Sequence, residues 1–271
     1  MNQLLSIVGF TYGLIALPIA PLAAIAPTAV EQPFQQDKSP SKQYESANLE
    51  FTPPDNFDGE GRPPQGQSGG ARGDCLQHLL SLSPKPTEIV AQPEACEIPG
   101  EETPTLTLSE FPTFWFYVPD QGGQGFAELT LFDPQGQPLR QQIVLSGQAG
   151  IIGIRLTQPI EVDRSYTWRF RIDETPSEAS MNSSVRGTVR RISPDLTLAI
   201  QLEAASAQEQ IALYAANGIW QETLTALIQL RQTQPSNAIQ ADWSSLLASV
   251  NLGSIANAPL LDCCTSRPVA D

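Results

Sequence analysis

The sequence contains little that could perform catalytic or metal chemistry. Its single histidine is His78, its 4 cysteines include no Cys-x-x-Cys spacing, and no lysine follows Lys85. A single histidine gives little support to a Ser-His-Asp or Cys-His arrangement, or to a zinc site. We therefore expect no enzyme activity, no cofactor and no metal.

Positive charge is also scarce. The chain has 15 basic and 29 acidic residues, for a net charge of -14, and residues 1–103 hold 13 of the acids but only 5 of the bases. An acidic balance of this size repels nucleic acid and anionic membrane surfaces at long range. We therefore expect neither as a partner, and solubility is the simplest role of the charge.

The first 26 residues lack any charged side chain. They are apolar from Leu4 to Leu17 and end in an Ala-Ile-Ala sequence, which predicts an export signal with a small-residue cleavage site. Because no Lys or Arg precedes the apolar run and Pro27 would hinder cleavage, retention as an anchor is the alternative. We expect a periplasmic or extracellular protein, with no membrane insertion after signal cleavage.

Export would place the cysteines in an oxidising compartment, where an even number favours pairing. Cys75 and Cys96 bracket 20 residues, and closing that loop would stabilise the fold by about 3 kcal/mol. We expect this disulfide. Cys263 and Cys264 are adjacent, so a strained vicinal disulfide, cross-links between chains and free thiols all remain open for them.

Residues 27–74 lack hydrophobic periodicity and are rich in Gln, Pro, Ser, Gly and acids, which predicts an acidic low-complexity arm. The Gly-rich run at 66–73 lacks the Gly-Lys-Ser/Thr of a phosphate loop. Phe57 stands where a calcium loop would need an oxygen ligand. A cysteine-bracketed loop, residues 75–103, follows the arm.

Residues 104–203 consist of short runs of alternating apolar and polar residues separated by turn residues. This pattern predicts an immunoglobulin-like antiparallel β-sandwich. Tyr166, Trp168, Phe170 and Ile172 should face the core from one strand. The expected strands include residues 126–132, 139–145, 151–156, 165–172 and 185–192.

The run TFWFYV at 113–118 is apolar on both faces. Phe114, Phe116 and Val118 can fill the core, so Trp115 and Tyr117 must face the other side. We expect the C-terminal helices or the cysteine-bracketed loop to cover this second face. The functional alternative is an exposed aromatic platform for a sugar or a partner.

Apolar residues recur at helical spacing within residues 204–258, on either side of Asn217 and Gly218. This spacing predicts two antiparallel helices, capped by a helix over 242–256 and followed by a flexible tail at 259–271. A single hairpin cannot form the groove of a repeat array, so we expect it to dock against the sandwich. The residues that match a tetratricopeptide-like hairpin are Tyr214, Gly218, Trp220 and Pro235, whereas Thr223 departs from that pattern.

Several blocks of sequence together suggest a family. They are FTPPDNFDGEGRPP through GGARGDC, LTLSEFPTFWFYVP, SYTWRFRI, and LYAANGIWQETLTALIQLR followed by DWSSLL and GSIA. Over about residues 51–258 the chain resembles the cyanobacterial family called domain of unknown function 928. The resemblance implies an exported cyanobacterial protein, and it implies no established activity, cofactor or catalytic residue.

Four arginines are the main candidates for a binding surface. Alternation sends Arg169 and Arg171 of one strand, and Arg186 and Arg190 of another, to faces away from the core. Immunoglobulin-like order would make these strands neighbours. Carboxylates such as Asp173, Glu174 or the acidic arm could cover the arginines, and an external anion is the alternative.

These observations favour a non-catalytic, exported binding or interaction module of the cell envelope. Its partner would be an envelope protein or an acidic glycan. A structural or assembly role in the envelope is one alternative, and a carboxylate-based hydrolase is another, because spatial proximity cannot be inferred from one sequence. The acids available to a hydrolase are Glu110, Glu128, Glu161 and Asp163.

Overall fold

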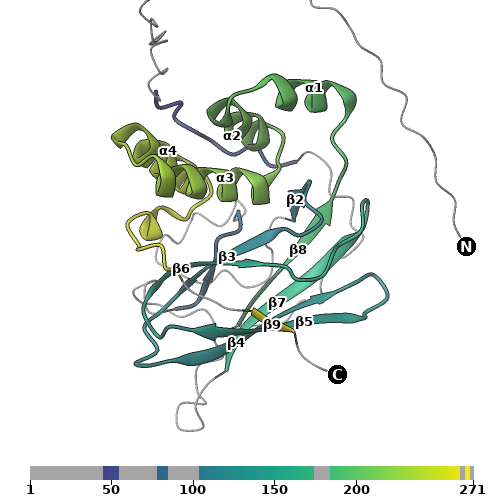
Figure 1. Ribbon diagram of the computed structural model, residues 1–271, viewed down its shortest axis with the longest axis vertical. Coiled ribbons are helices and arrows are strands. Elements are labelled where there is room, and N and C mark those ends of the chain that lie inside the picture. Colours follow the sequence, from purple (N-terminus) through teal and green to yellow (C-terminus); the bar gives the residue numbers. More distant parts are fainter. Residues whose placement is uncertain (1–44, 55–77, 85–103, 174–183, 263–265, 269–271) are drawn as a thin grey trace, which may run out of the picture. The chain divides into compact units, whose positions relative to one another are not determined.

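The computed structural model describes residues 45–54, 78–84, 104–173, 184–262 and 266–268, all within the unit Gln43–Asp271 (Figure 1). The strands of this part are β1 (Leu80–Ser81), β2 (Thr105–Thr107), β3 (Thr113–Val118), β4 (Gly125–Phe132), β5 (Pro138–Leu145), β6 (Gly150–Arg155), β7 (Ser165–Asp173), β8 (Ser184–Arg191) and β9 (Ser266–Pro268). The helices are α1 (Leu196–Ala204), α2 (Ala207–Ala216), α3 (Trp220–Thr233), α4 (Asn237–Ser249) and the short 3-10 helix η3 (Gly253–Ile255). The expected class, mainly β with C-terminal α, is confirmed.

The strands form two sheets. One has three strands in the order β1-β3-β6, and the other has six in the order β2-β8-β7-β4-β5-β9. Neighbouring strands are antiparallel except β2 and β8, which run parallel. The five strands expected from period-two alternation at residues 126–192 all form, and β4 and β5 are joined by a turn in which Gly136 has φ +79°.

Apolar side chains from the two sheets pack against each other and form one hydrophobic core. Trp168 of β7 lies at its centre, with the rings of Phe114 and Phe116 each 5.7 Å away in edge-on contact. Phe116 stacks on Phe170 with a centroid distance of 4.1 Å. Alternation along β3 and β7 directs these rings inward, so the facing sides of the two sheets are buried together.

The helices form a second core against the other side of the three-stranded sheet (Figure 1). Trp220 and Trp243 are both 0% exposed in this core, which also includes Tyr117 of β3 and Ile151 of β6. Gly218 joins α2 to α3 with φ +70°, a conformation that other residues adopt only with strain. The three-stranded sheet is therefore covered on both faces.

Both faces of β3 are covered, which shows where the second apolar face of the TFWFYV run packs. Tyr117 is 3% exposed in the helical core, and the Trp115 indole Nε1 donates to Thr225 Oγ1 of α3 at 3.0 Å. Trp115 lies across Gly153 of the neighbouring strand, where an added Cβ would stand 2.7 Å from the indole ring. The expected cover by C-terminal helices is confirmed, and the alternative of an exposed aromatic platform at Trp115 and Tyr117 is wrong.

Part of the N-terminal segment also packs on the helices. Leu49 and Phe51 are buried in the helical core, and Thr52 N donates to Ala215 O at 3.1 Å. Asp242 of α4 accepts from the hydroxyl of Ser46 at 2.8 Å. Residues 45–54, which composition alone assigns to a low-complexity arm, therefore cross the helices in a defined path.

Candidate functional site

The four candidate arginines lie where the alternation places them. β7 and β8 are adjacent, and Arg169 stands directly opposite Arg186 in their register. Arg171 pairs with Ser184, and Arg190 pairs with Ser165. All four therefore share the outward face of the six-stranded sheet, because paired residues in neighbouring strands point to the same side.

The structure adds a fifth arginine to this surface. Thr130 of β4 pairs with Arg169 on one side and with Arg140 of β5 on the other. Arg169 and Arg140 are exposed, whereas Arg186 is half-buried. We call this surface the arginine face, and its residues are Arg140, Arg169, Arg171, Arg186 and Arg190.

Acidic side chains offset only part of this charge within the described residues. Asp163 Oδ1 lies 3.9 Å from Arg190 Nη2, a loose and exposed contact that stabilises little. Glu128 lies opposite Arg171 in the register and accepts from the Thr130 hydroxyl at 2.8 Å. No carboxylate of the described residues lies within 4.0 Å of the guanidinium groups of Arg140, Arg169 and Arg186.

Two of the groups expected to cover the arginines cannot be placed. Glu174 lies outside the described residues, as do residues 27–44 and 55–74 of the arm. Asp173 ends β7 and pairs with Phe126 of β4. Coverage of the arginine face by the acidic arm therefore stays a prediction.

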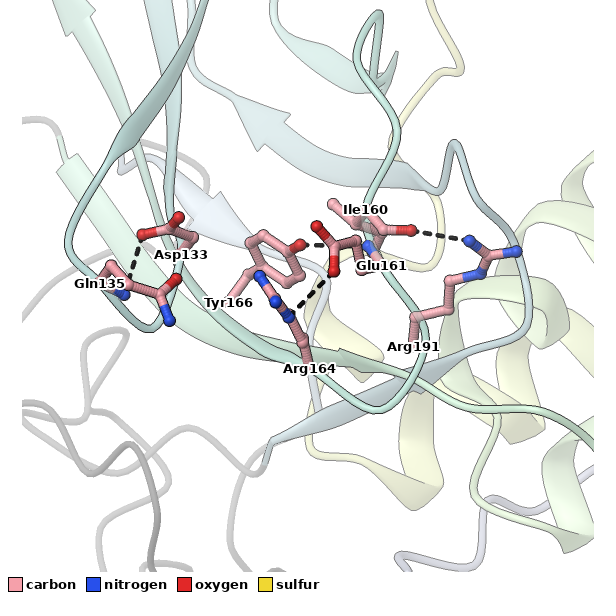
Figure 2. Close-up of polar contacts among 7 residues, drawn as sticks. All are labelled: Asp133, Gln135, Ile160, Glu161, Arg164, Tyr166 and Arg191. Carbon is pink, nitrogen blue, oxygen red and sulfur yellow. Dashed lines mark hydrogen bonds and ion pairs between the residues drawn. The ribbon is translucent and has the colours of Figure 1, made fainter.

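Three of the four carboxylates considered for hydrolysis, those of Glu128, Glu161 and Asp163, make local contacts. Glu161 Oε2 is 3.0 Å from Arg164 Nε in the loop between β6 and β7 (Figure 2). In the same loop Glu161 N donates to the Tyr166 hydroxyl at 3.1 Å, and Arg191 Nη1 donates to Ile160 O at 2.8 Å. The two cavities described below are lined by other residues than Glu110, Glu128, Glu161 and Asp163.

A cavity of about 290 Å³ lies between α2, α3 and the segment that joins β2 to β3. Glu222 of α3 lines it, and its Oε1 accepts from Thr107 Oγ1 at 2.7 Å and from Ser109 N at 3.0 Å. Its Oε2 is buried and has no hydrogen-bond partner within the described part of the chain. Burial raises the pKa of Glu222 although these hydrogen bonds oppose the shift, and burial together with the charge of Glu222 raises the pKa of Tyr214.

Glu222 should make stability depend on pH. Because the pKa of Glu222 is raised in the folded state, the folded chain binds the carboxyl proton more tightly than the unfolded chain does. The stabilisation of the fold by this proton is complete below the unfolded pKa of about 4.3. It is lost as the pH rises through the folded-state pKa. The free energy of unfolding of the wild type, minus that of Glu222→Gln, should therefore fall with rising pH. The total change is about 1.4 kcal/mol for each unit of pKa elevation.

Urea unfolding at several pH values between 4 and 8 measures this difference. Glu203→Gln is the matched control, because Glu203 is exposed on α1 and loses the same charge. If the unfolding free energy of the wild type, minus that of Glu222→Gln, rises with pH, the pKa of Glu222 is not raised by folding.

A second cavity, of about 530 Å³, lies between the end of α3, the start of α4 and residues 257–260. Arg231 lines it, with its guanidinium carbon 4.7 Å from the centroid of the Trp243 ring. Sequence reasoning missed this residue. The available signal was that Arg231 is the only basic residue between Arg191 and Arg267.

Neither a metal centre nor a membrane-spanning helix is found in the described ranges. They contain no group of three or more His, Cys, Asp or Glu side chains placed to hold an ion. None of their helices has the length and apolar character needed to cross a bilayer. The cysteines of the predicted Cys75–Cys96 disulfide lie outside the described residues, as do Cys263 and Cys264.

Comparison with known proteins identifies the family. The model of the family called Domain of Unknown Function (DUF928) matches residues 67–260. The chain belongs to this family. The DUF928 match includes both described sheets up to β8 and all four α-helices, so the arginine face and both cavities fall within it. No curated protein and no solved structure matches the chain.

Proposed function

We propose that this DUF928 chain is an exported, non-catalytic binding module of the cell envelope that binds a polyanion through its arginine face. One observation carries the proposal. Arg169 and Arg186 are directly opposed on adjacent strands without a carboxylate partner among the described residues. Opposed like charges destabilise a sheet, so an external anion would relieve a cost that the described part of the fold leaves in place.

The spacing of the face suits a linear array of negative charges. Adjacent strands lie about 4.8 Å apart, so Arg186 and Arg169 are neighbours while Arg140 lies two strands beyond Arg169. Arginine presents a planar fork that binds carboxylates in a bidentate manner. We favour an acidic glycan as the ligand, with an acidic protein segment as the second candidate.

The finer fold is part of the proposal. The order β8-β7-β4-β5 opposite β3-β6 corresponds to strands G-F-C-C′ opposite B-E of an immunoglobulin-like domain. The hydrogen bond between Glu161 N and the Tyr166 hydroxyl is similar to the tyrosine corner of such domains (Figure 2). The α2–α3 hairpin, with Gly218 at its turn and Trp220 beginning α3, supports a tetratricopeptide-like unit.

Export is proposed from the sequence. The uncharged apolar segment at residues 1–26 and the even number of cysteines support it. An oxidising compartment outside the cytoplasm would also bring the arginine face into contact with envelope glycans.

The double variant Arg169→Gln/Arg186→Gln should bind polygalacturonate about tenfold more weakly than the wild type. Two charge-assisted contacts of about 0.7 kcal/mol each, one at the exposed Arg169 and one at the half-buried Arg186, give this factor. Titration at 50 and 200 mM salt should show wild-type binding that weakens with salt, because exposed charges are screened. The unfolding free energy of the double variant should equal that of the wild type or exceed it by up to about 1 kcal/mol, because opposed like charges are removed.

Arg155→Gln is the control, and Arg169→Gln alone is the arginine-face variant that matches it in charge. Each removes one positive charge, and Arg155 is exposed on β6, in the other sheet, so its loss leaves the arginine face unaltered. Poly-glutamate in a parallel titration distinguishes an acidic protein segment from a glycan. If the wild type and the double variant bind equally well and their binding does not depend on salt, the proposal is contradicted. If the wild type binds neither polygalacturonate nor poly-glutamate, the structural role is favoured instead.

A further inference from the structure

The cavity beside Arg231 holds a positive charge that no carboxylate of the described residues neutralises. Arg231 Nε donates to Gln240 Oε1 at 3.0 Å. Within the described part of the chain, neither of its Nη atoms has an acceptor, Nη1 is buried, and no carboxylate lies within 4.0 Å. A guanidinium keeps its charge at any physiological pH, so this charge is partly desolvated and has no counterion among the residues that the structure describes.

The guanidinium is held in a fixed orientation. Gln240 fixes its Nε, and the ring of Trp243 lies under it with 4.7 Å between the guanidinium carbon and the ring centroid. Trp243 is itself 0% exposed, and its Nε1 donates to Ala256 O at 2.9 Å, so the platform is rigid. Ordering of the side chain is therefore complete before any ligand binds, which lowers the entropic cost of binding.

Polar and apolar groups share the lining of the remaining space. Ser236 and Asn237 begin α4 and line the cavity, and Asn257 lines it from the segment after η3. The positive end of the α4 dipole points toward the same space and adds to the arginine charge. A volume of about 530 Å³ lies within the range of small-molecule sites.

We propose that the Arg231 cavity is a binding site for a small monoanionic carboxylate. One guanidinium group matches one carboxylate group in charge, and its Nη2 can donate to that carboxylate, while the amide and hydroxyl groups of Asn237, Asn257 and Ser236 can bind neighbouring hydroxyls. This site is separate from the arginine face, because it is built by α3, α4 and residues 257–260. It does not depend on the proposed function.

Sodium acetate, titrated into the full-length protein against sodium chloride at equal ionic strength, tests the site. Acetate should raise the melting temperature and change tryptophan fluorescence, because a ligand of the folded state stabilises it and Trp243 underlies the guanidinium. In Arg231→Gln the apparent acetate affinity should fall at least tenfold. Arg231→Lys, which keeps the charge but loses the planar group that Gln240 and Trp243 hold in place, should also bind more weakly than the wild type.

The arginine-face variant Arg169→Gln/Arg186→Gln is the control, and it should respond to acetate as the wild type does. Glucuronate against glucose repeats the comparison with a pair that differs in one carboxylate. Equal responses to acetate and chloride, an acetate response that Arg231→Gln retains, or a response to phosphate alone would each overturn the proposal. If Arg231→Gln is unfolded, Arg231→Lys gives the same decision.

Discussion

Replacing Trp220 with alanine should lower the free energy of unfolding by about 3–5 kcal/mol. Trp220 is 0% exposed at the start of α3, and its ring lies 4.8 Å from that of Phe51 in edge-on contact. Truncation would leave a cavity between the helices, the N-terminal segment and the strand β1. Urea unfolding followed by circular dichroism measures the loss.

Trp220→Phe separates the ring from its hydrogen bond. The Trp220 Nε1 donates to Leu82 O at 2.6 Å, so phenylalanine would leave that buried carbonyl without this donor, at a cost of about 1–3 kcal/mol. If Trp220→Ala folds with wild-type stability and loses only a binding activity, the hairpin surface is a binding site and not a packing element.

The second large effect is expected at Trp168, in the core between the sheets. Trp168→Ala should cost about 3–5 kcal/mol, because Trp168 is 1% exposed and contacts Phe114 and Phe116. Its Nε1 is buried without a hydrogen-bond partner in the described part of the chain. Trp168→Phe therefore loses no such bond and should cost about 1–3 kcal/mol less than Trp220→Phe.

Denaturation of the two phenylalanine variants in parallel checks this contrast. Both lose the same atoms from fully buried tryptophans, so a difference between them reports the Leu82 hydrogen bond. Equal costs would contradict the assignment of that bond as the distinguishing contact.

Local periodicity determined a large part of this fold. The strands β4 to β8 and the helices α2 and α3 lie at the expected positions, because period-two and helical spacings are set by neighbouring residues. Alternation also placed Arg169, Arg171, Arg186 and Arg190 on one face. The family could be named from short sequence blocks, and the family model confirms it.

Elements that depend on distant partners were not predictable from these patterns. β1 has only two residues and exists because Leu80 pairs with Tyr117 of β3. β2 is short, and it runs parallel to β8 in a pairing that joins Thr105 with Val189. Strands this short carry no periodicity of their own, so their assignment depends on the strand that pairs with them.

The sequence by itself thus determined the class of the fold, the positions of its main strands and helices, and the arginines that share a sheet face. Only the tertiary structure decided that α3 covers Trp115 through Thr225, that Glu222 is buried against Thr107, and that Arg231 has no carboxylate partner among the described residues. Each of these outcomes joins residues from separate elements. Their burial and charge balance arise when sheets and helices pack, which no local spacing encodes.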